Sequence, residues 1–520
     1  VVLTDTGGAD SITINEDFTN DITVTLSADG AALSTNVDTV AANAAYANKL
    51  SVIAKISDTD DENAVITGGK GTSDSLTIKI DETDAPILSD VTLIESLIIT
   101  DGDTTANHTG TFTLANANAT YTSATVYETL TIDSTAIGAD GDSVVIDAAL
   151  EVDGKVVIKT GAAADTITVD ASANFGSDIT AGAGIDTIKF ATAALTAADK
   201  IDGGDGVDIL SATDDATVVD ADFTLITSVE TITSAATIDL DLTIDELAMA
   251  AGLATVTFAD TASAGDTLTI TKGFTNSLTV NLDDADTHTN VVDASAYVGS
   301  GTITVKTKSE LEDHTATANT ITGSAGTDVF EIAINDSSSN TAMTGLTKFE
   351  TIKITDDDAD TDHTFTFVLA DQNVVHTNGS SYETITIDAS AIGANGDTAN
   401  INAATEDDSK VIMKGGAGVN TITLSTSANH GDTVTAGAGA DIISAGASNL
   451  TKLDSIDAGD GTDTLTFSAN ATVLDAAFTE VSNLEKVTST ADIEVTLTLG
   501  SEAAEAGITT INLAGTNGTD

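Results

Sequence analysis

The chain has 520 residues, in which 82 Asp and Glu stand against 17 Lys and no Arg, giving a formal net charge of −65 at pH 7. So few cationic side chains cannot neutralise a phosphate backbone or an anionic lipid surface, which excludes nucleic acid and charge-driven membrane attachment. Cys is absent, which excludes disulfide bonds, thiol catalysis and thiolate metal sites. Because like charges repel in a compact state, the first partner to expect is a cation.

The chain is nevertheless apolar enough to fold, since 41% of its residues are hydrophobic. No apolar run approaches the roughly 18 residues of a membrane span. A chain without Cys suits export through an exposed or oxidising space, where a stray thiol would be a liability.

Short alternating segments at 76–80, 277–282 and 302–305 predict strands, with Thr on the polar face of each. Clusters of Gly, Asp and Asn between them predict turns. Four Ala-rich stretches, at 41–47, 193–198, 246–251 and 502–506, predict short helical connectors. The predicted fold class is therefore all-β with minor helix.

The whole chain is a tandem duplication. The segment Tyr127–Asp133 returns 255 residues later as Tyr382–Asp388, and His108 and His363 obey the same offset. The register holds without a gap over about 140 residues, as repeat architectures require. The pattern stops within an element at residue 520, so we expect the sequence to be a window on a longer repeat protein.

A glycine-rich motif recurs in both copies. Gly203-Gly204-Asp205-Gly206-Val207-Asp208 fits the nonapeptide pattern of calcium-binding β-rolls, and the related turns begin at 182, 416, 437 and 459. Glycines permit left-handed turns that aim carbonyl oxygens inward, and Asp adds a hard carboxylate ligand, so these turns predict Ca²⁺ sites. The predicted ligand residues are Gly182, Gly184, Asp186, Gly204, Asp205, Gly206, Asp208, Gly437, Gly439, Asp441, Gly459, Asp460, Gly461 and Asp463.

The spacing of these turns predicts a stack of carboxylates. Asp165, Asp186 and Asp208 are 21 and 22 residues apart, so a solenoid turn of that length would place them in a ladder about 4.8 Å apart. The alternative for each turn is an ordinary Asx turn without an ion. The turn at Asp165 lacks its second Gly, and Asn420 replaces Asp in the other copy, so both of these turns are expected to be free of calcium.

Two further features have structural and ionic interpretations. The pattern Leu-x-x-x-Glu-x-Ile, with Glu95, Glu230, Glu350 and Glu485, predicts a solenoid turn in which Glu caps backbone N–H groups. Acidic runs such as 58–62 are weaker candidates for cations. The six His are scattered, and recognised catalytic motifs are absent from the sequence, so we expect no enzyme.

The glycine turns resemble those of the RTX (repeats-in-toxin) proteins, which leave the cell by type I secretion. Together with the Thr, Ala, Asp and Gly bias, the missing Cys and the Glu turns, they look most similar to the bacterial S-layer proteins of that group. The resemblance implies that calcium folds the β-roll after export and drives assembly into a lattice held on cell-surface polysaccharide. The spacing of 21 to 22 residues departs from the nine of that family.

These observations predict parallel β-solenoid or β-roll segments with β-rich connecting domains, in two copies of a unit of about 255 residues. The predicted divisions are 1–104 and 259–359 for the β-rich domains, and 105–258 and 360–520 for the calcium-binding solenoids. The expected function is a self-assembling, calcium-dependent S-layer protein whose main partner is itself. A calcium-stiffened adhesin or matrix fibre is the alternative, and a polysaccharide lyase or epimerase with appended repeats is a third interpretation.

Overall fold

The structure is a computed structural model of the chain. It describes all residues except 5–10, 28–38, 56–64, 81–82, 84, 86–87, 103–106, 120, 124–125, 139–140, 153, 172–174, 193, 236, 260–264, 283–289, 309–318, 335–344, 357–362, 375–383, 394–396, 428, 447–448 and 515–520. The chain divides into two compact units, Val1–Thr255 (unit 1) and Val256–Asp520 (unit 2). The division follows the duplication seen in the sequence.

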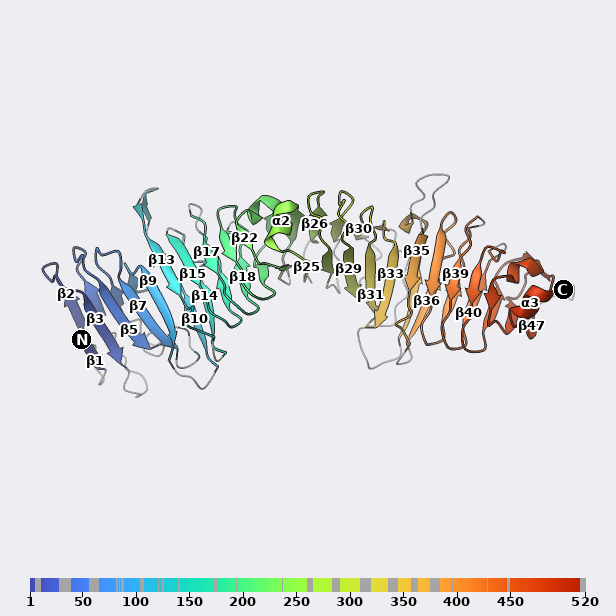
Figure 1. Cartoon of the computed structure of the whole chain (residues 1–520), viewed down its shortest axis with the longest axis horizontal. Helices are drawn as coiled ribbons and strands as arrows, with labels where there is room; N and C mark the ends of the chain where they lie inside the picture. The colour runs from blue at the N-terminus through green and yellow to red at the C-terminus, as the bar shows by residue number, and fades with distance from the viewer. Residues whose placement is uncertain are drawn as a thin grey trace. The chain divides into compact units, whose positions relative to one another are not determined.

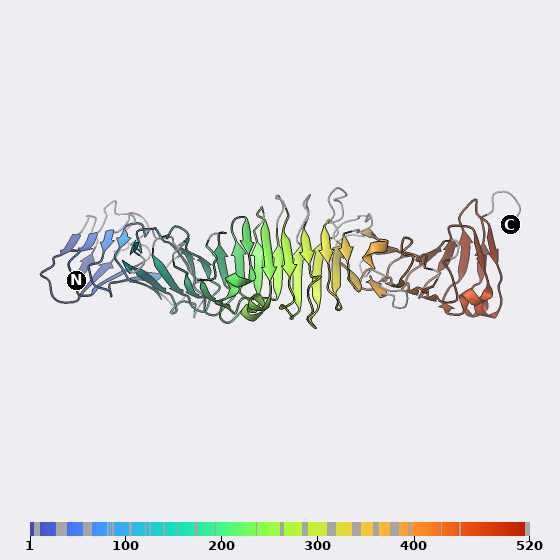
Figure 2. The ribbon, with the colours of Figure 1, turned by 90° about the horizontal axis from the view of Figure 1, so that it is seen from above.

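Each unit is a stack of coils in which successive turns add strands to parallel sheets, and the β-solenoid has about 17 turns in all. Strand accounts for 45% of the structure and helix for 5%, which confirms the predicted fold class. Within each unit the strands lie side by side in successive turns (Figures 1 and 2). None of the helices in the described part of the chain is long and apolar enough to cross a lipid bilayer.

Unit 1 contains three main parallel sheets and two smaller pairs of strands. The first sheet comprises β1 (Val2–Thr4), β3 (Ile22–Ser27), β5 (Leu50–Lys55), β7 (Ser75–Ile80), β9 (Ser96–Asp101), β13 (Thr129–Asp133), β15 (Lys155–Lys159), β17 (Asp178–Thr180), β19 (Lys200–Asp202) and β22 (Ile226–Thr227). The second comprises β10 (Thr109–Thr113), β14 (Ser143–Asp147), β16 (Thr166–Thr168), β18 (Thr187–Phe190), β20 (Ile209–Ala212) and β23 (Thr231–Ser234). The third comprises β2 (Ser11–Ile14), β4 (Thr39–Ala42), β6 (Val65–Thr67) and β8 (Val91–Thr92).

The remaining elements of unit 1 are short. They are the antiparallel pair β11 (Tyr121–Ser123) and β12 (Val126–Tyr127), the parallel pair β21 (Ala216–Val218) and β24 (Leu240–Ile244), the 3₁₀ helix η1 (Asp220–Phe223) and the helix α2 (Glu246–Ala251). The strand β25 (Thr255–Phe258) begins at the division between the units. The first sheet runs from β9 to β13 by direct parallel pairing, so residues on both sides of the predicted boundary at 104/105 belong to one sheet.

Unit 2 repeats this plan. Its first sheet comprises β27 (Leu278–Leu282), β29 (Ile303–Lys308), β31 (Val329–Ile334), β33 (Thr351–Asp356), β35 (Thr384–Asp388), β37 (Lys410–Lys414), β39 (Thr433–Thr435), β41 (Ser455–Asp457) and β44 (Val481–Ser482). Its second comprises β34 (Thr364–Val368), β36 (Thr398–Asn402), β38 (Thr421–Thr423), β40 (Ile442–Ala445), β42 (Thr464–Phe467), β45 (Lys486–Ser489) and β47 (Thr510–Asn512). The other elements are β26 (Thr267–Ile270), β28 (Val291–Asp293), β30 (Thr320–Thr322), β32 (Leu346–Thr347), β43 (Ala471–Val473), β46 (Val495–Leu497), η3 (Asp371–Asn373), η4 (Asp475–Phe478) and α3 (Ser501–Glu505).

Alternating Thr and aliphatic residues produce these strands, because period two sends one set of side chains inward. In β13, Leu130 and Ile132 are buried, while Thr129 and Thr131 alternate with them and are only partly buried. The parallel register then aligns identical residues in successive turns. Ile132 pairs with Ile158 of β15, and Ile158 pairs with Ile179 of β17. Each such side chain contributes roughly 1.5 to 3 kcal/mol through burial, and the column forms the core of the solenoid.

The predicted helices at 246–251 and 502–506 are confirmed as α2 and α3, the latter displaced by one residue. The helix predicted at 41–47 is wrong. Residues up to Ala42 continue β4, which pairs with strands on both sides, and Asn43 then closes a turn by accepting the N–H of Ala45. Strand pairing outweighs the helix propensity of Ala in so short a segment, since nucleating a helix is costly.

The helix predicted at 193–198 is also wrong for its described residues, 194–198. Thr196 and Asp199 form a local turn in which the Asp199 carboxylate accepts the N–H of Thr196 at 2.6 Å. Leu195 is buried by this turn. Asp and Thr compete with helical hydrogen bonding in this way, and the segment 194–199 therefore folds as a turn.

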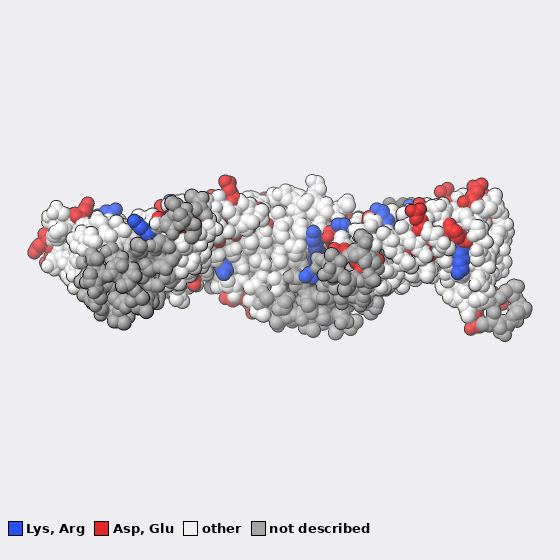
Figure 3. Space-filling model, turned by 90° about the horizontal axis from the view of Figure 1, so that it is seen from below, with Lys and Arg blue, Asp and Glu red and all other residues white. Residues whose placement is uncertain are grey.

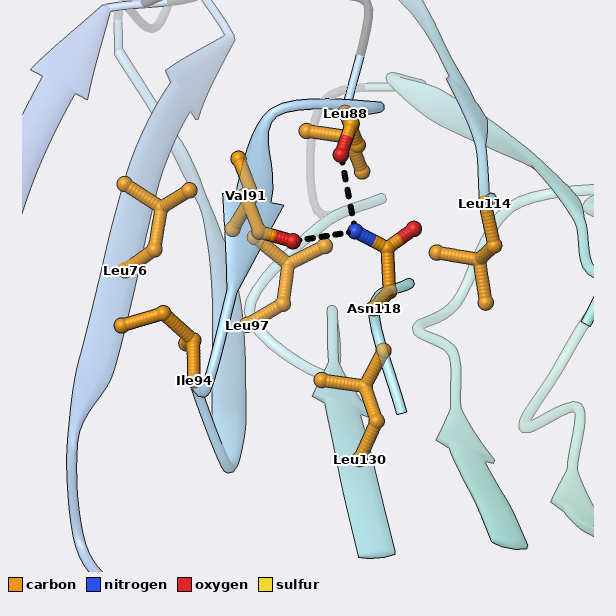
Figure 4. Close-up of a pocket in the computed structure, with 8 residues that line it drawn as sticks. All are labelled: Leu76, Leu88, Val91, Ile94, Leu97, Leu114, Asn118 and Leu130. Atoms are coloured by element: carbon orange, nitrogen blue, oxygen red, sulfur yellow. Dashed lines mark hydrogen bonds between the residues drawn. The ribbon is translucent and has the colours of Figure 1, made fainter. Parts of the chain in front are cut away.

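A buried Asn fixes the connection that follows β10 in unit 1. The Asn118 amide donates to the carbonyl oxygens of Leu88 and Val91, at 2.7 Å each (Figure 4). Its Oδ1 accepts the N–H of Ala115. Apolar side chains surround it, and they leave about 10 Å³ of empty space beside Leu76. Asn373 makes the corresponding bonds in unit 2, to the Leu346 carbonyl and from the Ala370 N–H. Each unit thus ties its 3₁₀-like corner to the turn before it.

Many of the acidic side chains lie inside the solenoid. Fourteen Asp and two Glu are buried, whereas no Lys of the described residues is. On the face drawn in Figure 3, acidic and basic side chains are scattered among uncharged ones. The buried carboxyl groups gather at the corners between sheets, and the glycine turns form some of these corners.

Candidate cation sites in the glycine turns

Each predicted glycine turn joins a strand of the first sheet to a strand of the second. Residues 181–186 join β17 to β18 and residues 203–208 join β19 to β20, while residues 436–441 and 458–463 do the same in unit 2. The motif glycines have φ between 93° and 156°, which only Gly adopts without strain: Gly182, Gly184, Gly204, Gly206, Gly437, Gly439, Gly459 and Gly461. The left-handed turns predicted from the sequence are confirmed.

The Asp residues of these turns form the predicted ladder. In unit 1 the N–H of Asp165 donates to Asp186 Oδ1 at 2.7 Å, and the N–H of Asp186 donates to Asp208 Oδ1 at 2.8 Å. Strand register confirms turns of 21 and 22 residues here. In unit 2 the N–H of Asp441 donates to Asp463 Oδ1 at 2.7 Å. One oxygen of each carboxylate is therefore held by the backbone of the preceding turn.

The second carboxylate oxygen has no such support. Oδ2 of Asp186, Asp208, Asp441 and Asp463 is buried and has no hydrogen-bond partner among the described residues. Each of these side chains is no more than 1% exposed. A buried carboxylate oxygen without a donor is strongly unfavourable when charged, so each site requires a proton or a cation.

The pKa values of these four Asp residues are raised, as expected for buried carboxyl groups. Burial, with the neighbouring Asp165 and Asp208 carboxylates, raises the pKa of Asp186 to about 7. Burial and Asp463 raise the pKa of Asp441 to about 6. The pKa values of Asp208 and Asp463 are also raised, by burial and by the Glu of the next turn. Without a cation, the four sites hold their protons more tightly than ordinary carboxyl groups.

Asn420 shows what the interior of such a turn recognises. Its side-chain amide nitrogen lies 3.2 Å from the Gly416 oxygen, 2.8 Å from the Gly418 oxygen and 3.2 Å from the Ala436 oxygen. It also lies 3.1 Å from Asp441 Oδ1. Four oxygens thus converge on one donor group. One turn further along, Asp441 occupies the position of Asn420 and offers an oxygen where Asn420 offers N–H donors.

Other Asp residues of the same kind are satisfied by the protein itself. Asp74 accepts the N–H groups of Leu50 and Gly69, at 2.7 Å each. Asp165 accepts those of Val144 and Gly161, at 2.8 and 3.3 Å. Asp328 accepts the N–H of Ile303, and its other oxygen accepts both groups of Ser324. Nothing in these arrangements calls for a cation, in contrast to the four Asp of the Gly-x-Gly-x-Asp turns.

Glu residues close the ladders, as the sequence predicted. A Glu95 oxygen accepts the N–H of Asp74 at 2.7 Å, and Glu230 does the same for Asp208 at 2.8 Å. Glu350 and Glu485 repeat the contact in unit 2. In all four turns the residue two positions before the Glu is left-handed although it is not Gly, with φ of 54° to 59°: Leu93, Ser228, Lys348 and Asn483. The predicted backbone-capping role of the Glu is confirmed.

Asp205 and Asp460 lie differently from the other predicted ligands. Both side chains are exposed, and both residues contribute backbone bonds between adjacent turns. The N–H of Asp205 donates to the Gly182 carbonyl, and the Asp205 carbonyl accepts the N–H of Gly184. They therefore join the turns together, while the buried carboxylates come from Asp186, Asp208, Asp441 and Asp463. The acidic run at 58–62 lies outside the described residues.

Comparison of the chain with protein-family models, curated proteins and solved structures found no match.

The arrangement fits a hard cation. Each turn supplies a buried carboxylate oxygen without a donor, beside carbonyl oxygens that the left-handed glycines direct inward, and every available ligand is oxygen. This is the ligand set that Ca²⁺ prefers. For Asp441, the carbonyls that correspond to those around Asn420 belong to Gly437, Gly439 and Ala458. A bound Ca²⁺ would supply the positive charge that the buried ladder lacks.

Sequence reasoning missed the ladders that contain Asp74 and Asp328. The signal was present for the second of them, because Gly323-Ser324-Ala325-Gly326-Thr327-Asp328 has the same length as the Gly203–Asp208 motif. Glu350 also follows Asp328 by the same 22 residues that separate Glu230 from Asp208. An Asp followed 22 residues later by a Glu therefore identifies the ladder, even where Ser324 replaces the second glycine of the motif.

The substitution Asp441→Asn is expected to have opposite effects with and without calcium. Its amide would donate to the carbonyls of its own turn as Asn420 does, so the free energy of unfolding at pH 8 should rise by about 1 to 3 kcal/mol without cations. The increase in the free energy of unfolding on adding calcium should be smaller than in the wild type, because one calcium site is lost. Differential scanning calorimetry in EDTA and in calcium measures both effects.

The matched control is Asp460→Asn, which makes the same charge change on an exposed side chain in the next turn. It should leave both melting temperatures near those of the wild type. A lower melting temperature for Asp441→Asn in EDTA, together with an undiminished response to calcium, would contradict the assignment.

Proposed function

We propose that the chain is a structural protein of the bacterial cell surface, in which calcium completes the β-solenoid and copies of the chain assemble into an S-layer. The observation that carries the proposal is the set of four buried carboxylates, Asp186, Asp208, Asp441 and Asp463, each with one oxygen that has no donor among the described residues. A protein that must neutralise such groups to become stable is suited to a compartment where calcium is abundant, which is the outside of the cell.

The net charge of −65 supports the same order of events. At low calcium, repulsion and buried carboxylates oppose the compact state, so the chain would remain extended during export. At millimolar calcium the ion sites are occupied and the repeats are stabilised in the folded state. The proposal assigns the chain no catalysis, and its type I export and its attachment to surface polysaccharide rest on the resemblance to RTX S-layer proteins alone.

The test is a titration of the EDTA-treated chain with calcium, followed by far-UV circular dichroism and light scattering, with magnesium as the control. We expect a calcium-specific gain of β signal at low concentration and then growth of large ordered particles. Sheets with a regular repeat under the electron microscope would support the S-layer assignment. A gain of β signal without assembly would favour the adhesin or fibre alternative, and a chain already fully β in EDTA and unchanged by calcium would contradict the proposal.

A further inference from the structure

Unit 2 contains an acidic cluster outside the glycine turns. Asp371 begins η3, which is separated from β34 by two residues, while Glu406 and Asp408 lie in the turn between β36 and β37. Parallel pairing of β34 with β36 aligns Val368 with Asn402, and the N–H of Leu369 donates to the Asn402 carbonyl. The two connections therefore leave the sheet side by side. One carboxylate oxygen from each of the three residues lies within 4.8 Å of the other two.

Glu406 is the buried member of this cluster. Its side chain is 0% exposed, and its Oε1 accepts the N–H groups of Asp408 and Ser409 at 3.0 and 2.7 Å. Its Oε2 is buried and has no hydrogen-bond partner among the described residues. Asp371 and Asp408 are accessible to solvent. The buried Glu406 is thus held in place at one oxygen, while its other oxygen lacks a positive partner.

In the same corner of unit 1, both oxygens of the buried Glu accept hydrogen bonds. Glu151, the counterpart of Glu406, accepts the N–H of Ala119 at Oε2 and that of Gly154 at Oε1, at 3.1 and 2.9 Å. Asn116 stands where unit 2 has Asp371, and its Oδ1 accepts the N–H of Val152. Asp153, the counterpart of Asp408, lies outside the described residues. Unit 1 satisfies both oxygens of the buried Glu with backbone donors, whereas in unit 2 one oxygen of Glu406 has no donor among the described residues and Asp371 lies nearby.

Electrostatics point in the same direction. The pKa of Glu406 is raised by burial first, and then by the negative charges of Asp408 and Asp371. The pKa of the buried Asp432 is raised mainly by burial, and the negative charge of Glu406 raises it further. Three carboxylate oxygens within 4.8 Å of one another are near enough for one hard cation to bridge them after small side-chain shifts. Mg²⁺ demands near-ideal octahedral geometry and gives up its water ligands reluctantly, whereas Ca²⁺ accepts irregular sets of carboxylate oxygens such as this one.

We propose that Asp371, Glu406 and Asp408 form a calcium site that is specific to unit 2. The ion joins the turn after β34 to the turn before β37, and so ties two successive coils of the solenoid together at their outer edge. The proposal does not rest on the glycine turns, because none of its residues belongs to them. It makes the two copies of the repeat unequal in the number of ions that they hold.

The test is to count the calcium bound to the full chain at pH 7.5 by equilibrium dialysis, with magnesium present to occupy weak surface sites. Asp371→Asn introduces the residue type found in unit 1, and Asp408→Asn removes the second accessible carboxylate. Each variant should bind one calcium fewer per chain, or bind it at least tenfold more weakly. The control is Asp407→Asn, an exposed neighbour outside the cluster, which should bind as many ions as the wild type.

A double variant, Asp441→Asn with Asp463→Asn, separates this site from the glycine turns. It should lose ions from the turns and retain the one that Asp371→Asn removes. If Asp371→Asn and Asp408→Asn both bind calcium in the wild-type number and strength, the cluster site is refuted whatever the turns do. If only the cluster variants lose an ion and the double variant loses none, the cluster stands and the assignment of the turns fails.

Discussion

At pH 8, removal of divalent cations is expected to lower the melting temperature of the protein by about 10 °C or more, since each site occupied at 100 times its dissociation constant contributes about 2.7 kcal/mol. Two glycine-turn Asp residues in each unit carry a buried oxygen that has no donor among the described residues, and in EDTA no cation would neutralise it. This is the largest single effect that the structure predicts, because it acts on every proposed turn site at once.

The dependence on pH gives this prediction a distinctive sign. The unfolded chain loses the Asp protons near pH 3.8, whereas the folded chain retains them up to about pH 7 at Asp186 and about pH 6 at Asp441. Between these limits the folded state binds more protons, so without cations its stability is greatest near pH 4 and falls as the pH rises towards 7. Each unit of pKa difference corresponds to about 1.4 kcal/mol.

Calcium should remove or reverse this decline, because the ion replaces the protons. Calorimetric scans from pH 4.5 to 8, in EDTA and in calcium, compare the two curves, with magnesium as the ionic-strength control. Melting temperatures in EDTA that rise steadily from pH 5 to 8 would show that the buried carboxylates are not protonated in the cation-free fold. An equal response to magnesium would remove the preference for calcium.

The substitution Gly204→Ala is expected to destabilise unit 1 by about 2 to 5 kcal/mol, with or without calcium. Gly204 has φ of 99°, and a Cβ atom added there would lie 1.9 Å from the backbone oxygen of Gly182 in the turn below. That oxygen accepts the N–H of Asp205, so relief of the clash must separate two stacked turns. Backbone atoms on both sides leave no flexible side chain that could move instead.

Val207→Ala in the same turn is the control, because Val207 is 52% exposed and its loss should change stability by less than about 0.5 kcal/mol. Chemical denaturation followed by circular dichroism measures both variants. A Gly204→Ala chain as stable as the Val207→Ala chain would show that the turns are not stacked as closely as the structure has them.

The repeated parts of the fold were predictable from the sequence because periodicity carries their geometry. The alternation of Thr and Ile in Thr129–Asp133 determines which side chains face the core, and a spacing of 21 to 22 residues determines that Asp186 stacks between Asp165 and Asp208. The Glu turns were predictable for the same reason, since the buried residues Val229 and Ile232 fix the place of Glu230 at the sheet corner.

Two kinds of feature could not be predicted in this way. The Ala-rich segment before Tyr46 has the composition of a helix, and only pairing with strands from neighbouring turns makes its first residues a strand. The cluster of Asp371 and Glu406 unites residues 35 positions apart whose proximity depends on the pairing of β34 with β36. Sequence reasoning looked for cations in the glycine turns and in contiguous acidic runs, and neither pattern joins these two residues.

The most direct test of the account is an anomalous difference map from crystals grown in calcium and then exchanged into terbium. We predict strong peaks about 2.3 to 2.6 Å from Oδ2 of Asp186, Asp208, Asp441 and Asp463, with carbonyl oxygens of their glycine turns completing the coordination. A map without density at these four oxygens, in crystals that bind the metal elsewhere, would contradict the central claim. The Asp ladder would then be a structural feature whose buried carboxyl groups carry protons and bind no ion.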